Sequence, residues 1–227
     1  MDIIRTQGPA ARGDRTLLVM LPGAHLLPSD FARHGFLEDL HARGGPVDAI
    51  AAGLKPDDYL DGDVGARLHR AVIAPALERG YKRLWLLGIS LGGMGAMLYA
   101  RAHKARVDGI ILLAPFLATR GTIAEVIAAG GLAAWEPGPL SRTDIERGLL
   151  AWLKSRPFAR GARPRLLLGY GGADRYADAS RLLAAHMPPD QIAVAEGGHD
   201  WPTWTTLWRR LLDATPFEAT VAGEARD

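Results

Sequence analysis

Short apolar runs alternate with longer segments of helical periodicity along most of this chain. Each apolar run is followed by glycine, proline or polar residues, and runs of this length are typical of buried strands. The predicted strands are residues 16–21, 47–52, 83–87, 107–114, 165–169 and 192–195, and residues 1–10 are a candidate for an additional edge strand.

Helical periodicity fills the gaps between these runs. The predicted helices cover about residues 30–43, 64–80, 91–103, 123–129, 144–155, 177–186 and 203–213. Pro75 lies inside the second helix, and because proline lacks an amide hydrogen we expect a kink or break there. Strands that alternate with helices predict an α/β protein, a three-layer α/β/α sandwich with a mostly parallel, doubly wound sheet.

The alternation is interrupted between residues 116 and 164. This segment predicts two helices separated by the turn W-E-P-G-P-L, and we interpret it as a small helical insertion that forms a minimal cap. A chain of 227 residues is typical of one domain, so we expect a single domain over residues 1–227. Residues 215–227 are mostly small and polar, which predicts a flexible tail.

Composition and charge narrow the partners that we expect. The chain is 48% apolar and 23% charged, which is enough apolar material for a core, and its net charge is only +2. The basic residues are scattered, which argues against nucleic acid, and no arginine cluster is placed to favour a phosphorylated or coenzyme A substrate. With no cysteine, disulfides and thiolate metal sites are excluded. No signal or membrane-spanning run is visible, so we expect a cytoplasmic protein without a membrane partner.

One stretch, L-L-G-I-S-L-G-G-M-G at residues 86–95, places glycines around Ser90. Residues 88–92 match the pattern G-x-S-x-G, after a predicted strand and before a predicted helix. A sharp strand-to-helix turn needs small flanking residues, and it would expose the hydroxyl at the carboxyl edge of the sheet, where ligands gather. Ser90 is therefore a candidate nucleophile. The alternative interpretation is a glycine-rich turn that carries no chemistry.

A serine nucleophile needs a base, and the base needs a group that orients it. His199 lies in G-G-H-D-W directly after the strand predicted at 192–195. Asp174 lies in G-Y-G-G-A-D-R-Y after the strand predicted at 165–169. With Ser90 these residues follow three strands at one edge, in the order Ser, Asp, His, which is one of the known chain orders of a catalytic triad.

Other interpretations exist for the acidic residue. Asp174 precedes a helix, so it is also a candidate N-cap, although Asp178 fits that role better because the helical pattern starts after it. Asp200 is adjacent to His199, and neighbouring residues generally do not orient each other's side chains as a triad requires. We therefore prefer Asp174 as the orienting group.

An oxyanion hole needs two backbone N–H groups. The residue after the nucleophile, Leu91, would supply one, and the loop after the first clear strand would supply the other. That loop reads L-P-G-A-H-L at residues 21–26, with Gly23 at the turn, so we expect the second N–H from Ala24. The side chain of His25 would line the pocket or hold the loop. The alternative is an ordinary turn between strand and helix.

Together, G-I-S-L-G-G, G-G-A-D-R-Y and G-G-H-D-W resemble the α/β-hydrolase superfamily, from about residue 16 to residue 212. The string G-G-H-D-W-P-T-W is similar to that of small bacterial esterases within it. The resemblance implies Ser90 as nucleophile, His199 as general base and Asp174 as its orienter, with no cofactor and no metal. It also implies the α/β-hydrolase fold.

The sequence departs from this family pattern at two places. Many relatives carry His-Gly after the first oxyanion strand, whereas this chain has Pro22 and Gly23, which bears on the contribution of Ala24. The large cap of many relatives is missing, because only residues 116–164 are available for a lid.

The implied reaction is hydrolysis of a carboxylic ester through an acyl-enzyme. We expect a small-molecule substrate with a short or medium apolar acyl or aryl group; a thioester or a lactone would use the same groups. A hydrolase fold kept as a non-catalytic binding module is the alternative. Tryptophans are candidates for an apolar pocket wall, although packing of helices on the sheet explains them equally well: Trp135, Trp152, Trp201 and Trp204.

Overall fold

A computed structural model describes residues 2–8, 15–55, 58–59, 63–141, 143–158 and 161–219. Its centre is a seven-stranded sheet with the order β1-β3-β2-β4-β5-β6-β7, in which β1 is antiparallel to β3 and every other pairing is parallel. The predicted mostly parallel sheet, including the edge strand, is confirmed. The strands are Asp2–Thr6 (β1), Thr16–Leu21 (β2), Val47–Gly53 (β3), Arg83–Ile89 (β4), Gly109–Leu113 (β5), Arg165–Gly171 (β6) and Ile192–Ala195 (β7).

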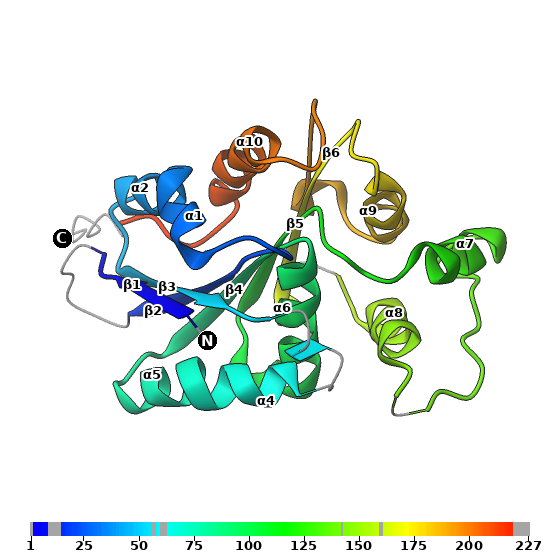
Figure 1. The fold of residues 1–227 in the computed structure, drawn as a ribbon, viewed down its shortest axis with the longest axis horizontal. Coiled ribbons are helices and arrows are strands. Elements are labelled where there is room, and N and C mark those ends of the chain that lie inside the picture. Colours follow the sequence, from blue (N-terminus) through cyan, green and yellow to red (C-terminus); the bar gives the residue numbers. More distant parts are fainter. Residues whose placement is uncertain are drawn as a thin grey trace, which may run out of the picture.

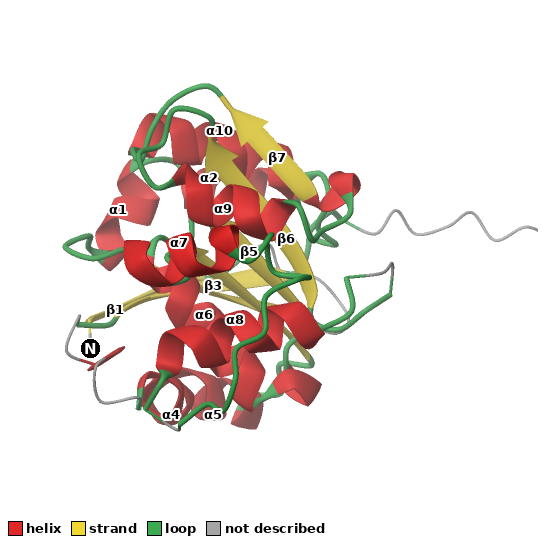
Figure 2. Ribbon diagram, turned by 90° about the vertical axis from the view of Figure 1, so that its right-hand side faces the viewer, coloured by secondary structure: helices red, strands yellow, loops and turns green. Residues whose placement is uncertain are grey.

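Helices cover both faces of this sheet, as Figures 1 and 2 show. They are Pro28–Arg33 (α1), Phe36–Ala42 (α2), Val64–Leu68 (α4), Ala74–Glu78 (α5), Leu91–Ala102 (α6), Arg120–Ala128 (α7), Ile145–Ser155 (α8), Ala177–Ala184 (α9) and Trp201–Leu212 (α10). In the part of the chain that the structure describes, none of them combines the length and the apolar character needed to cross a bilayer.

Two apolar cores lie on the two faces of the sheet because successive side chains of a strand point to opposite sides. In β2, Leu17 and Val19 pack with α4, α6, α8 and α9, whereas Leu18 and Met20 pack with α1, α2 and α10. A strand buried on both faces needs apolar residues throughout, which explains the unbroken apolar runs in the sequence.

Two predicted helices differ from the observed ones. The helix expected over residues 30–43 is divided into α1 and α2, because Gly35 has a left-handed backbone with φ of 77°. The helix expected over residues 64–80 contains a π-helical turn, His69–Ile73, between α4 and α5, just before Pro75. We infer that this wider turn accommodates the proline ring and its missing amide hydrogen, so the rod in Figure 1 continues through the expected break.

Residues 116–164 contain α7 and α8, which share one core with α6 and α9. Trp135, between the two helices, is buried and donates its indole N–H to Glu125 at 2.9 Å. The start of the expected tail is packed, because Phe217 is fully buried against Trp85 at a ring distance of 5.2 Å. Residues 220–227 of that tail lie outside the described residues.

A buried ionic network lies at the opposite edge of the sheet from the carboxyl ends of its parallel strands. Asp48 of β3, whose side chain is 4% exposed, accepts hydrogen bonds from Nε of Arg15 at 2.8 Å, from the amide of Gly8 at 2.9 Å and from the hydroxyl of Tyr81. Burial alone would raise the pKa of the Asp48 carboxyl, but the hydrogen bonds from Arg15 and Tyr81 outweigh burial and lower it. This carboxylate of β3 therefore links the segment after β1 with the segments that precede β2 and β4.

We expect Asp48→Asn to lower the free energy of unfolding by about 2–3 kcal/mol at pH 7, because it removes the buried charge that pairs with Arg15 and replaces one acceptor oxygen by a donor. The pKa of the carboxyl is lower in the folded state, so its stabilisation is present above its unfolded pKa of about 4 and declines as the pH falls below it. Urea unfolding at pH 7 and pH 3 measures this. The difference between wild type and variant should shrink at pH 3.

Asp213→Asn is the matched control, because its ion pair with Arg43 is at the surface and the Asp213 side chain is 70% exposed. We expect this control to change the free energy of unfolding by less than about 1 kcal/mol. Equal losses in the two variants would contradict the role assigned to the buried network.

Candidate active site

Ser90 lies at the turn from β4 to α6 with φ of 50° and ψ of −116°, a conformation that is costly for a residue with a side chain. Backbone hydrogen bonds hold this geometry. The Ser90 amide donates to the carbonyl of Leu113 at 3.0 Å, and the Ser90 carbonyl accepts from the amides of Gly93 and Phe116, both at 2.9 Å. The serine backbone is therefore fixed against the end of β5 and the segment that follows it.

The glycines around Ser90 are required by close contacts between backbone segments. A Cβ atom on Gly88 would lie 2.4 Å from the carbonyl oxygen of Gly92, and one on Gly92 would lie 2.1 Å from that of Leu21. Both distances are far below van der Waals contact. The loop after β2 is also packed tightly here, since a Cβ on Gly23 would lie 3.2 Å from Cβ of Ser90. These backbone contacts explain why the positions beside Ser90 need small residues, as the sequence predicted.

Backbone strain collects at this edge of the sheet. Besides Ser90, two described residues other than glycine have positive φ: His25 at 62°, shortly after β2, and Ala114 at 45°, directly after β5. Such conformations persist where the surrounding structure holds them, and they cluster at functional sites.

Asp174 and His199 meet at the same edge. Nδ1 of His199 is 2.7 Å from Oδ2 of Asp174, whose side chain is 1% exposed, while the His199 side chain is 17% exposed. The other Asp174 oxygen accepts the amide of Tyr176 at 2.8 Å. The two loops approach so closely that a Cβ on Gly171 would lie 2.4 Å from the carbonyl oxygen of Gly197. The carboxylate is thus positioned to orient the imidazole and to favour a proton on Nδ1, leaving Nε2 as the acceptor.

The neighbouring acidic residues have structural roles. Asp200 is the N-cap of α10 and accepts hydrogen bonds from the amide of Thr203 at 3.0 Å and from its hydroxyl, and these bonds lower the pKa of the Asp200 carboxyl. The sequence suggested Asp178 as the N-cap of α9, but Asp178 does not occupy that position. It lies inside the first turn of that helix and forms an ion pair with Arg181 at 3.0 Å, because α9 begins two residues earlier than its apolar pattern.

Two aromatic rings flank His199. Trp204 of α10 is buried and its ring lies 5.1 Å from the imidazole, edge to face. Tyr176 is 42% exposed and its ring lies 5.0 Å away, also edge to face. Sequence reasoning missed Tyr176, although it stands in the motif G-G-A-D-R-Y.

The other predicted pocket residues lie at different distances from this centre. Trp201 contacts Trp204 at 5.3 Å between ring centres and stacks on His34 at 4.3 Å, so it is one ring removed from His199. Trp135 and Trp152 lie in the insertion, where Trp135 donates to Glu125 and the ring of Trp152 lies 5.2 Å from the guanidinium carbon of Arg156. His25 is exposed in the loop after β2.

The amides expected to form an oxyanion hole are available. Among the described residues, the N–H groups of Leu91 and Ala24 have no acceptor. Leu91 is the first residue of α6, where helix geometry leaves the N–H unpaired. Ala24 directly follows Gly23, which packs against Ser90.

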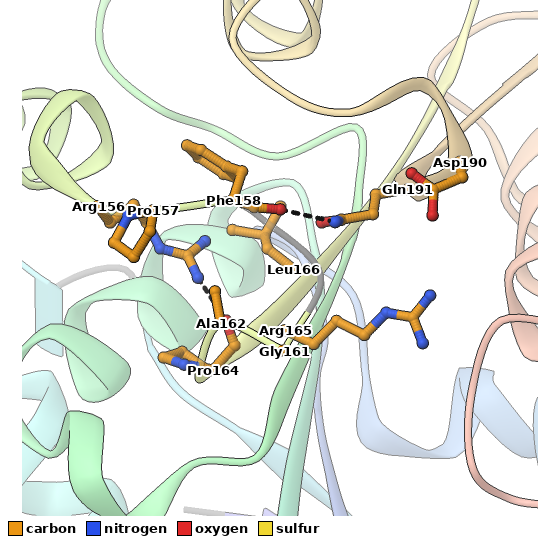
Figure 3. A pocket seen from close by; sticks show the side chains of 10 residues that line it. All are labelled: Arg156, Pro157, Phe158, Gly161, Ala162, Pro164, Arg165, Leu166, Asp190 and Gln191. Carbon is orange, nitrogen blue, oxygen red and sulfur yellow. Dashed lines mark hydrogen bonds between the residues drawn. The ribbon is translucent and has the colours of Figure 1, made fainter.

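A pocket of about 220 Å³ lies elsewhere, at the start of β6 and therefore at the opposite end of that strand from Asp174 (Figure 3). Arg156 reaches into it, donates to the carbonyl of Pro164 and lies 4.6 Å from the ring centre of Phe158. Burial lowers the pKa of this guanidinium to about 10. The aromatic contact and the carbonyl hold a buried cation, and we assign this pocket no part in the chemistry at the other edge.

A comparison with known protein families found a match to part of the chain. A family model described as "Serine aminopeptidase, S33" matches residues 66–144, which is less than half of the chain. No curated protein matches the sequence.

Several solved structures share the fold over more than nine-tenths of the chain. FphF, a fluorophosphonate-binding serine hydrolase of Staphylococcus aureus, superposes with a TM-score of 0.64 at 14% identity, over 93% of this chain and 91% of its own. A ferulic acid esterase gives 0.60 at 16% identity over 96% and 98%. Est1E of Butyrivibrio proteoclasticus gives 0.59 at 13% identity over 93% of both chains. At such identities the likeness shows a shared fold.

We expect Gly92→Ala to destabilise the protein by more than about 3 kcal/mol or to prevent folding, because its methyl group would overlap the carbonyl of Leu21 and move the turn at Ser90. Thermal or urea unfolding measures the loss. Gly121→Ala is the matched control: Gly121 is also helical, but a Cβ there meets nothing within 4 Å, so we expect a gain of about 0.5–1 kcal/mol. Equal stability of the two variants would contradict the close packing described at the turn.

Proposed function

We propose that this chain, a member of the α/β-hydrolase superfamily by its fold, is a serine hydrolase that cleaves carboxylic esters through an acyl-enzyme. The observation that carries the proposal is the hydrogen bond between His199 and the buried carboxylate of Asp174, at the edge where Ser90 occupies a strained turn. The fold is shared with proteins whose names describe serine hydrolases and esterases, which supports the same class of reaction.

In the first half of the proposed reaction, Oγ of Ser90 attacks the carbonyl carbon of the ester while Nε2 of His199 takes the hydroxyl proton. The carbonyl oxygen becomes an oxyanion and accepts hydrogen bonds from the amides of Leu91 and Ala24. Collapse of this intermediate breaks the bond to the alcohol oxygen, which leaves with the proton from His199. An acyl group then remains on Ser90.

In the second half, a water molecule attacks the acyl carbon and gives its proton to His199. The new intermediate occupies the same oxyanion hole and collapses to release the carboxylic acid, while His199 returns the proton to Ser90. The net reaction is ester plus water to acid plus alcohol. Asp174 keeps the imidazole in one tautomer and stabilises the imidazolium that forms twice in each cycle.

The surroundings of His199 favour a substrate with an apolar acyl or aryl portion. Tyr176, whose ring borders the imidazole, is exposed, and Trp201, which contacts the buried Trp204, is partly exposed. Such rings bind apolar groups through contact area and can also bind rings edge to face. We therefore propose short or medium apolar acyl or aryl groups at the reacting end of the substrate.

We expect Ser90→Ala to reduce hydrolysis of 4-nitrophenyl butyrate by at least about 1000-fold, because the variant has no nucleophile to form the acyl-enzyme. Release of 4-nitrophenol measures turnover, and covalent labelling with a fluorophosphonate followed by mass spectrometry measures the nucleophile directly. Ser141→Ala, at an exposed position, is the control and should retain both signals. Wild-type protein without turnover and without a label on Ser90 would indicate a binding module instead.

We expect Asp174→Asn to reduce kcat by about 100- to 10,000-fold, because asparagine would present a donor to Nδ1 and favour the wrong imidazole tautomer. Steady-state kinetics on the same ester measures this. Asp200→Asn tests the neighbouring carboxylate: asparagine is also a good N-cap, so kcat should change by less than about threefold. A greater loss in the second variant would show that Asp200, and not Asp174, supports the base.

A further inference from the structure

Two arginines lie against the ring of Tyr176, which flanks the imidazole of His199. The guanidinium carbon of Arg175 is 4.8 Å from the ring centre of Tyr176, and that of Arg120 is 5.7 Å from it. The same ring lies 5.0 Å from His199. Both guanidinium groups are therefore one aromatic ring away from the proposed base, and both residues are exposed.

These arginines come from separate parts of the chain. Arg175 follows Asp174 in the loop after β6, whereas Arg120 is the first residue of α7 in the insertion. The sequence suggested no arginine cluster placed to favour a phosphorylated or coenzyme A substrate. In the structure, two arginines that are distant in sequence contact the same ring.

The charges of these two arginines are not neutralised by nearby carboxylates. Across the described ranges, neither guanidinium has a carboxylate within ion-pair distance, and both oxygens of Asp174 are already occupied by His199 and Tyr176. Arg181, close to the same loop, differs because it pairs with Asp178. The contacts with the Tyr176 ring stabilise each guanidinium group while leaving its N–H donors free to bind an anion.

We propose that Arg120 and Arg175 form an anion-binding subsite, so that the preferred substrates are small esters or thioesters that carry a carboxylate or phosphate group away from the reacting carbonyl. This inference rests on the proposed hydrolase function. Guanidinium groups bind both anions through charge-assisted hydrogen bonds, and positive charge at a site attracts anionic substrates before they bind. The apolar rings would hold the reacting end, and the arginines the charged end.

Two pairs of substrates test the subsite, each with a neutral and an anionic member. The first pair is 4-nitrophenyl hexanoate and the 4-nitrophenyl monoester of adipic acid, which places a carboxylate on the acyl side. The second pair is S-butyryl-N-acetylcysteamine and butyryl-coenzyme A, which places phosphates on the leaving group. We expect the wild type to favour the anionic member of at least one pair by about tenfold in kcat/KM, and less at 0.5 M salt.

Variants then assign the preference to the two residues. We expect Arg120→Gln and Arg175→Gln each to reduce the anionic-to-neutral ratio about threefold, and the double variant to bring it near one. Arg79→Gln is the matched control, because it removes the same charge from an exposed position that precedes β4 at the opposite edge of the sheet. That control should keep the wild-type ratio. Calorimetric titration of Ser90→Ala with the adipic monoester should show binding that weakens when both arginines are also replaced.

The outcomes separate this inference from the proposed function. Equal kcat/KM for the two members of both pairs, with Ser90-dependent turnover intact, would overturn the anion subsite and leave the hydrolase proposal standing. A preference that persists in the double variant would assign anion binding to other residues and would also overturn it. Absence of Ser90-dependent turnover on all four substrates would overturn the proposed function itself, and with it the inference.

Discussion

The close contact of three backbone segments at the carboxyl edge of the sheet is the constraint on which the candidate site depends. The start of α6 lies against the end of β2, with room at Gly92 for a hydrogen atom and not for a methyl group, and it lies equally close to Gly88. This contact makes the turn after β4 so sharp that Ser90 takes a strained backbone conformation. The loop after β2 is brought against Ser90 by the same contact, so the proposed nucleophile and the proposed oxyanion donors depend on one backbone contact.

A second close approach of two backbone segments positions His199, the proposed base. The loops after β6 and β7 pack backbone to backbone at Gly171 and Gly197, and this contact places the His199 imidazole on the Asp174 carboxylate. Asp200 contributes through the helix that follows. As the N-cap of α10 it determines where that helix begins, and the start of the helix in turn places the Trp204 ring against the imidazole. Sheet order brings the two loops to one edge, and the side-chain contacts follow from backbone packing.

The insertion, which we interpreted from the sequence as a minimal cap, also packs into the core of the domain. Its helices share a core with α6 and α9, so they are part of the folded body of the domain. Its first helical residue, Arg120, reaches the exposed ring of Tyr176 beside His199. The insertion thereby adds a positive charge beside the ring that Arg175 also contacts. We infer that it affects which substrates are favoured more than how the bond is broken.

The sequence by itself determined the strands, most helices and the three loops that carry Ser90, Asp174 and His199, because apolar periodicity and glycine-rich turns reflect the backbone within a few residues. Its errors were also local: Gly35 divides a predicted helix, and a π turn replaces the break expected at Pro75. Only the tertiary structure decided the 2.7 Å contact of His199 with Asp174 and the meeting of Arg120 with Arg175 at one ring. Such contacts join residues far apart in the chain, and their distances depend on how helices and loops pack on the sheet, which local pattern does not specify.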